Sequence, residues 1–281
     1  MFRNRPCAVW AALGVAAVGL VACATATAAP IVLENGNSWA RFCTDSQLGN
    51  DIWLVDDWNY LRQQWFWYRV DDPAGPAGGE RSLDTLDPAP SAYVTDTDGD
   101  GIDDNLRLRY ADGNQGLTVE INYNLLGGTP GSGRADLAET IRITNTSRAA
   151  QHVHFFQYVD FILSDAQDTV WIPWPNTADQ WFGAIHTAET VATPVPSHYD
   201  VGTVPGILNA LNDALPTTLG DQAGPIAGDV AWAFQWDMEI GPGDSRLISK
   251  DKSLVILPEP ATLALVGLGV AGLVARRRNR S

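Results

Sequence analysis

The 281-residue chain has few cysteines, methionines and histidines: three, two and four of them. So few cysteines exclude a fold built on a disulfide framework. If a leader is removed after Ala28, only Cys43 remains, and no disulfide can form within the mature chain. A lone cysteine is most often a small buried hydrophobe, so we expect Cys43 to be buried. The fold must then depend on a hydrophobic core, and eleven tryptophans, one of them in the leader, indicate that it has one.

Positive charge is also scarce, with 18 Lys and Arg against 33 Asp and Glu and a net charge of −15. The first 28 residues hold two arginines, and the last 24 hold four arginines and one glutamate. The remaining body, residues 29–257, therefore has 12 basic and 32 acidic residues, a net charge of −20. Such a body repels nucleic acid and anionic membrane surfaces, which excludes both as partners, and it attracts divalent cations.

Common catalytic signatures are absent from the sequence. It contains no Gly-x-Ser-x-Gly, no phosphate-binding loop, no Cys-x-x-Cys and no His-Glu-x-x-His. We therefore expect a protein that is not an enzyme. A secreted hydrolase is the alternative, and it would need a cleft with two carboxylates, at least one of them with a raised pKa.

The N-terminus has the three parts of a signal peptide. Arg3 and Arg5 precede the apolar run 8–21, and an Ala-Thr-Ala cleavage sequence ends at Ala28. We predict a signal helix in residues 1–28, cut by signal peptidase. The alternative is a lipobox, Leu-Val-Ala-Cys, which would place a lipid on Cys23.

The C-terminus combines Pro258-Glu259-Pro260, the apolar run 261–275 and four arginines before the last residue, Ser281. The apolar run is about 15 residues long, somewhat short of the roughly 20 of a spanning helix, and the arginines would stay cytoplasmic. This tail, residues 258–281, resembles the PEP-CTERM sorting signal of exported proteins in exopolysaccharide-producing Gram-negative bacteria. The resemblance implies export across the inner membrane, transient tethering by a membrane helix, and cutting by an exosortase near the Pro-Glu-Pro motif. The alternative is an ordinary anchor that is never cut.

The body, residues 29–257, reads as one all-β domain. Alternating apolar residues predict strands at 61–70, 106–110, 117–125, 138–144, 152–163, 230–240, 245–249 and 252–257. Only residues 205–215 have helical spacing, with proline in the first turn. Many alternating strands joined by Gly, Pro and Asn turns favour an antiparallel β-sandwich with one short helix. Residues 133–161 and 227–252 resemble uncharacterised exported proteins that carry the same tail.

An acidic loop is the sharpest candidate site. Asp96, Asp98 and Asp100 occupy the first, third and fifth positions of a calcium-loop pattern, the carbonyl of Ile102 the seventh and Asp104 the ninth. The pattern resembles the calcium loops of thrombospondin type 3 repeats and dockerins. Arginine stands at the twelfth position, where a bidentate glutamate belongs, so we expect a modest affinity of about 10⁻⁴ M and a structural role. A metal-free acidic turn is the alternative.

Two further patterns remain. His152 and His154 lie on one strand face with a spacing that can bind zinc or copper, but the sequence identifies no third ligand, which favours simple packing. Trp171, Trp174 and Trp181 lie in a stretch without clean periodicity, and such exposed indoles can form a platform for sugars. An Asp-Asp-Trp run at 56–58 invites the same interpretation.

These features together predict an exported cell-surface or extracellular-matrix protein, structural or adhesive in an exopolysaccharide biofilm and ordered by Ca²⁺. Its partners would be signal peptidase and exosortase during export, and the exopolysaccharide afterwards. A carbohydrate-binding module that uses Trp171, Trp174 and Trp181 is the alternative.

Overall fold

The computed structural model describes residues 28–71, 78–86, 91–164 and 167–257. Apart from Ala28, the predicted signal peptide lies outside these residues. So do Pro258, Glu259 and Pro260 and the membrane segment that follows them. Among the described residues, no helix has both the length and the hydropathy needed to cross a bilayer.

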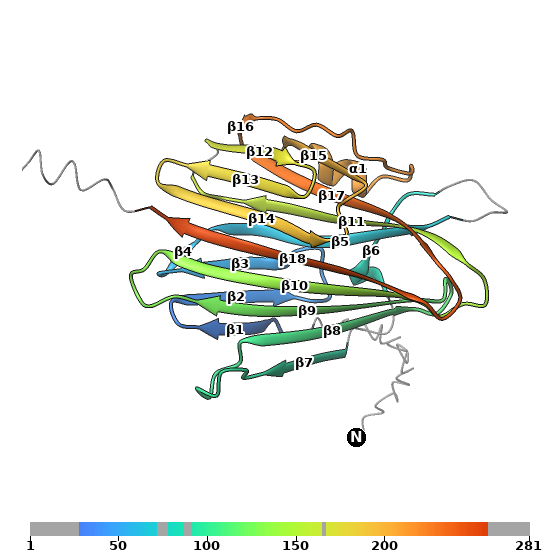
Figure 1. Ribbon diagram of the computed structural model, residues 1–281, viewed down its shortest axis with the longest axis horizontal. Helices are drawn as coiled ribbons and strands as arrows, with labels where there is room; N and C mark the ends of the chain where they lie inside the picture. The colour runs from blue at the N-terminus through green and yellow to red at the C-terminus, as the bar shows by residue number, and fades with distance from the viewer. Residues whose placement is uncertain (1–27, 72–77, 87–90, 165–166, 258–281) are drawn as a thin grey trace, which may run out of the picture.

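Two nine-stranded sheets form the two layers of the molecule (Figure 1). Sheet A has the path β1 (Ile31–Asn35), β2 (Ser38–Cys43), β3 (Gly49–Val55), β5 (Leu61–Val70), β11 (Gln151–Phe161), β17 (Val230–Ile240) and β15 (His198–Thr203), with β4 (Trp58–Asn59) and β6 (Arg81–Ser82) at its side. Sheet B has the path β16 (Ile226–Gly228), β12 (Asp168–Trp174), β13 (Thr177–Phe182), β14 (Ile185–Thr193), β18 (Ser245–Ile256), β10 (Arg134–Asn145), β9 (Leu117–Gly127), β8 (Asn105–Asp112) and β7 (Ser91–Thr95). Helix α1 (Gly206–Leu211) and the 3-10 turn η1 (Leu83–Thr85) are short additions. The predicted all-β antiparallel sandwich with one short helix is confirmed.

Strands with clean alternation form where the sequence predicts them. β5 and β17 have the predicted bounds, and β8 and β9, which contain the predicted strands 106–110 and 117–125, pair as a hairpin with Leu108 opposite Ile121. The alternate apolar residues of β9 are all buried between the sheets. β11 has largely apolar residues on both faces, as an internal strand does, and it lies between β5 and β17.

Other boundaries differ from the prediction. The segments 245–249 and 252–257 form one strand, β18, because Lys250 and Lys252 point inward and are paired there instead of marking a turn. Residues 39–60, which show no clean period, contribute β2, β3 and β4. The helix is shorter than the predicted 205–215 and ends at Leu211. Cys43 is half-buried at the end of β2, not fully buried.

The outer face of sheet A is partly covered. Residues around α1 and η1 lie over its middle: Trp67 Nε1 donates to Asn212 Oδ1 at 3.1 Å, and Trp65 Nε1 donates to Ser82 Oγ at 2.9 Å. Both tryptophans are consequently buried, and Trp65 also packs edge-on against Tyr110 of β8, with ring centroids 5.9 Å apart. Toward the start of β11 this cover ends, and polar side chains replace the aromatic ones.

Candidate functional site

The acidic loop between β7 and β8 gathers three of its carboxylates on the surface. One oxygen from each of Asp96, Asp98 and Asp100 lies within 4.8 Å of the others. Gly99 and Gly101 have φ of 83° and 92°, which glycine adopts at little cost. Hydrogen bonds from the backbone N–H groups of Gly101 and Gly99 lower the pKa of Asp96. The atoms that could bind a metal ion here are carboxylate oxygens, the ligand type that suits Ca²⁺.

The other two predicted calcium ligands lie differently. Asp104 is buried, and its carboxylate accepts hydrogen bonds from the N–H and hydroxyl of Thr97, at 3.0 and 2.8 Å. Ile102 is exposed, and its N–H donates to Asp100 Oδ1 at 2.8 Å. Asn35 Nδ2 donates to Asp98 Oδ2 at 2.9 Å and so ties the loop to β1. The structure therefore brings together Asp96, Asp98 and Asp100, with Asp104 bonded to the loop's own backbone.

The predicted tryptophan platform lies on strands, which corrects the expectation of irregular chain there. Trp171 and Trp174 belong to β12 and Trp181 to β13. Trp171 stands between buried Val170 and Ile172, so strand alternation points it outward from sheet B. Thr169 and Trp171 pair with Trp181 and Asp179, which places the indoles of Trp171 and Trp181 on the same outer face.

The three indoles differ in their exposure to solvent. Trp171 is 42 % exposed and Trp174 is 65 % exposed, whereas Trp181 is half-buried. Asp179 pairs with Trp171 in the register, and burial raises the pKa of its carboxyl against the opposing effect of His186. Indoles beside a carboxylate are a suitable surface for a ring that is apolar on its faces and polar at its edges.

A surface hollow of about 900 Å³ lies at the end of β13. Trp58, Tyr60 and Phe182 line it, and Trp58 is strongly exposed. The neighbouring Asp56 has a local structural role, since it accepts hydrogen bonds from the N–H groups of Gly131 and Gly133 at 2.6 and 2.7 Å. Of the run 56–58, Trp58 lines this hollow, whereas Asp56 and Asp57 line a separate and smaller one of about 380 Å³.

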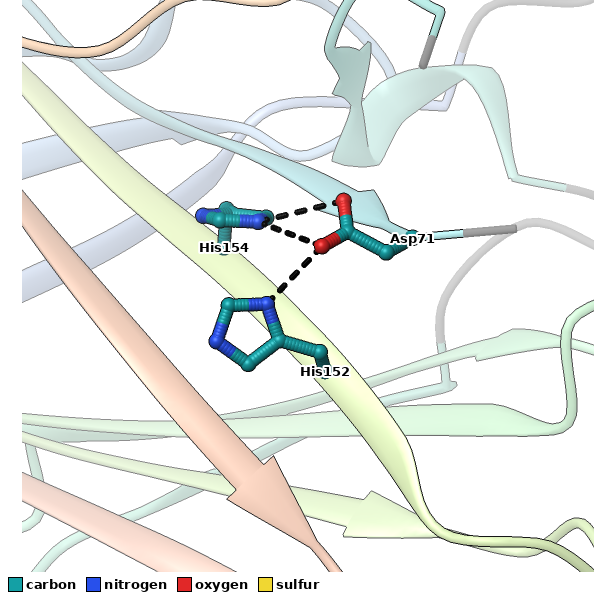
Figure 2. Close-up of side chains that lie close together, drawn as sticks. All are labelled: Asp71, His152 and His154. Atoms are coloured by element: carbon teal, nitrogen blue, oxygen red, sulfur yellow. Dashed lines mark hydrogen bonds and ion pairs between the residues drawn. The ribbon is translucent and has the colours of Figure 1, made fainter. Parts of the chain in front are cut away.

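On the outer face of sheet A, the strand register gathers a set of histidines and carboxylates. Arg69, His154 and Asp237 form one row across β5, β11 and β17, and His152 pairs with Glu239 in the row beside it. Asp71 directly follows β5, and its N–H donates to the carbonyl of His152 at 3.0 Å. We call Asp71, His152 and His154 the histidine–aspartate cluster; Figure 2 shows both imidazoles turned toward the Asp71 carboxylate.

Distances in this cluster are short. His152 Nδ1 lies 2.9 Å from Asp71 Oδ2, and His154 Nε2 lies 3.2 Å from each oxygen of Asp71. The other ring nitrogen of His154, Nδ1, lies 2.6 Å from Asp237 Oδ1. Burial would raise the pKa of Asp71, but the hydrogen bonds with His152 and His154 and the charges of His154 and Arg69 outweigh it and lower that pKa.

Sequence reasoning found the two histidines and missed the third member. Asp71 directly follows the predicted strand 61–70, and its sequence distance from His152 gives no sign of contact. The strands at 61–70 and 152–163 were both predicted, so pairing them in register would have placed Asp71 beside His152. Asp160, the acidic residue of the same strand, lies at the far end of β11 and is not part of the cluster.

Comparison with known proteins covers the tail and the body separately. A model of the PEP-CTERM protein-sorting motif matches residues 257–278. No curated protein matches the chain. A bacterial glucoamylase complexed with acarbose has a TM-score of 0.54 at 9 % identity, over 83 % of this chain and 32 % of that one, so this chain spans about a third of that enzyme.

Two further solved structures are similar over nearly their whole length. A putative aldose 1-epimerase from Escherichia coli K12 has a TM-score of 0.52 at 11 % identity, covering 81 % of this chain and 98 % of its own. A galactose mutarotase related enzyme from Lactobacillus acidophilus has a TM-score of 0.52 at 9 % identity, covering 82 % and 99 %. At these identities, the likeness extends to the fold alone.

The body is thus a two-sheet β-sandwich of the kind seen in these three proteins. The chain carries a PEP-CTERM sorting motif, which indicates an exported protein whose membrane-anchored precursor is processed by an exosortase.

Proposed function

We propose that the mature chain is a non-enzymatic adhesive protein of the cell surface or biofilm matrix. It holds an exopolysaccharide against the tryptophan face formed by Trp171, Trp174 and Trp181. The observation that carries this proposal is the placing of these tryptophans on neighbouring strands, two of them strongly exposed. An exposed apolar patch beside polar groups marks an interaction site more often than a bare surface.

Two other observations support the proposal. The sorting motif implies delivery of the chain outward through an exosortase. The similar folds include proteins described as a glucoamylase complexed with acarbose and as sugar epimerases or mutarotases, so this sandwich accommodates sugar-contacting surfaces elsewhere. Release of the body from the membrane would leave residues 29–257, which hold every described strand of both sheets and the core between them.

Retention on the host's own exopolysaccharide tests this function. The Ala29–Leu257 chain is expected to be retained, and the double variant Trp171→Ala with Trp174→Ala to bind about tenfold more weakly, because contact aromatics contribute most of such binding energy. Tyr93→Ala is the matched control, since Tyr93 is equally exposed but lies on β7 at the other edge of sheet B. Equal retention of both variants and the parent chain would refute the tryptophan face as the contact.

Calcium binding by the acidic loop belongs to the same proposal, with Asp96, Asp98 and Asp100 as the ligands and a structural role. At a Kd of about 10⁻⁴ M, 5 mM Ca²⁺ is expected to stabilise the body by about 2 kcal/mol and to raise its Tm by about 4–8 °C. Differential scanning calorimetry with Ca²⁺ and then with a chelator measures this shift.

The double variant Asp98→Asn with Asp100→Asn should abolish the calcium shift. Asp213→Asn, an acidic residue outside the loop, should retain it. A Tm that does not respond to calcium in the parent chain would leave the loop as a metal-free acidic turn. If retention on the polymer needs calcium, the chelator should release the bound chain.

A secreted hydrolase is the second candidate, and one carboxyl favours it. Burial raises the pKa of Asp160 to about 7, as a general acid requires, and a second carboxylate, that of Asp229, contacts the same Arg62 nitrogen, Nη1. Asp160 is buried, however, and lines none of the surface hollows described above. Release of reducing ends from the host polysaccharide, lost in Asp160→Asn, would replace the adhesive function with hydrolysis.

A further inference from the structure

The contacts of His154 are unusual for a neutral imidazole. Its Nδ1 lies 2.6 Å from an oxygen of Asp237, and its Nε2 lies 3.2 Å from both oxygens of Asp71. A neutral imidazole carries one N–H, so it can donate to only one of these carboxylates. The other nitrogen would then turn its lone pair toward an acceptor. The nitrogen lone pair and the carboxylate oxygen would then repel each other, and a cation bound between them removes this repulsion.

The spacing of the three groups fits such a cation. Zinc bonds of about 2.0–2.2 Å in a tetrahedral site place neighbouring ligand atoms about 3.3 Å apart. His154 Nε2 and His152 Nδ1 lie 3.2 and 2.9 Å from the carboxylate of Asp71. We propose that the histidine–aspartate cluster, Asp71, His152 and His154, binds a divalent transition-metal ion of the Zn²⁺ type.

The groups around the cluster support this assignment. Asp237 hydrogen-bonds to Nδ1 of His154, as carboxylates commonly do with metal-bound histidines, so Nε2 can bind the ion. Asp237 is itself fixed by Gln235, whose Nε2 donates to it at 2.7 Å. The ligand set of two imidazoles and one carboxylate suits zinc and its neighbours, whereas Ca²⁺ prefers sites made of oxygen alone.

The cluster is also open on one side. The side chains of His152 and Asp71 are 47 % and 41 % exposed, and they line a hollow of about 300 Å³. Glu239 lines the same hollow directly opposite His152 in the strand register. Water or Glu239 can therefore complete the coordination of an ion that enters from solvent.

The charge of the surroundings favours a divalent ion despite a nearby arginine. Arg69 contacts Asp71 at 2.5 Å, but it is also paired with buried Glu80 at 3.2 Å. Asp71 and Glu80 thus share the Arg69 guanidinium, while Asp237 beside His154 and Glu239 at the rim add two further acidic groups. This leaves net negative charge for the ion to neutralise.

Zinc titration of tag-free Ala29–Leu257 protein, by isothermal calorimetry, tests the site. One equivalent of Zn²⁺ should bind, and Asp71→Asn and His152→Ala should each weaken binding by at least tenfold. Both side chains are well exposed, so these variants should fold. Asp237→Asn should weaken binding by about 10–100-fold, because it only orients His154.

Two control variants make the test specific to this cluster. His186→Ala removes a histidine from sheet B, and Asp98→Asn with Asp100→Asn removes two carboxylates from the acidic loop. Both variants should bind zinc as the parent chain does. Wild-type zinc affinity in His152→Ala and Asp71→Asn would overturn the proposal. So would the absence of zinc binding, with NMR showing His154 doubly protonated, because an imidazolium alone would then account for its two carboxylate contacts.

Discussion

Replacing Glu139 with leucine is expected to lower the free energy of unfolding by about 3–5 kcal/mol. Glu139 lies on β10 inside the sandwich, where Lys250 Nζ contacts its Oε2 at 2.5 Å and Lys252 Nζ contacts its Oε1. Gln64 Nε2 donates to both of its oxygens, at 3.0 and 2.9 Å. All three charged side chains are fully buried. Burial already lowers the pKa of both lysines, and losing the carboxylate leaves their buried amino groups with less compensation, which is costlier than losing an exposed pair.

Chemical denaturation at neutral pH measures this loss. Glu120→Leu is the control, because Glu120 also sits on an interior strand of sheet B but pairs with Arg109 at the surface, 3.7 Å away, so its loss should cost less than about 1 kcal/mol. Adding Lys252→Met to Glu139→Leu should recover at least about 1 kcal/mol, since the two ions interact directly. A single Glu139→Leu variant as stable as the parent would mean that the buried lysines are held uncharged.

Asp160→Asn is expected to flatten the pH dependence of stability between about pH 4 and pH 7. Burial raises the pKa of Asp160 from its ordinary 3.8 to about 7, against the opposing charge of Arg62. In this window the folded chain holds a proton that the unfolded chain has released, so stability falls as pH rises. The contribution of protonated Asp160 to the free energy of unfolding is fully present below about pH 4 and is lost as pH rises past about 7. Its size is about 2–4 kcal/mol.

Unfolding free energies at pH 4.5 and pH 8, in about 0.5 M salt to screen surface charges, measure this effect. The parent chain should lose more stability than Asp160→Asn between these two values, and the variant should be the more stable protein at pH 8. An identical slope in the two proteins would show that Asp160 stays ionised in the folded chain, held by Arg62. That result would also remove the carboxyl that favours the hydrolase alternative.

The sequence predicted best those elements whose pattern is local. β9 alternates apolar and polar residues along its length, and a period of two is enough to assign both the strand and its buried face. The β8–β9 hairpin follows, since a short turn leaves only one way to pair the strands. The sorting motif is a local signal of the same kind, read from composition and order alone.

Prediction failed where polar residues lie inside the sandwich. Lys250 and Lys252 break the apolar pattern of β18, and only the buried carboxylates of Glu139 and Glu189 explain why the strand continues through them. Trp171 and Trp174 gave no periodic signal because β12 has an irregular register between them. Both failures concern contacts with other strands, which no short window of sequence contains.

By itself the sequence determined the fold class, the main strands, the C-terminal sorting motif and the acidity of the loop at Asp96, since each depends on neighbouring residues along the chain. Only the tertiary structure decided which side chains meet. Asp71 joins His152 and His154 because β5 and β11, about 80 residues apart, pair in one register, and a shift of one residue would turn the histidines to the other face. That register is fixed by the packing of the whole sandwich, so the cluster exists only once the sheets have formed.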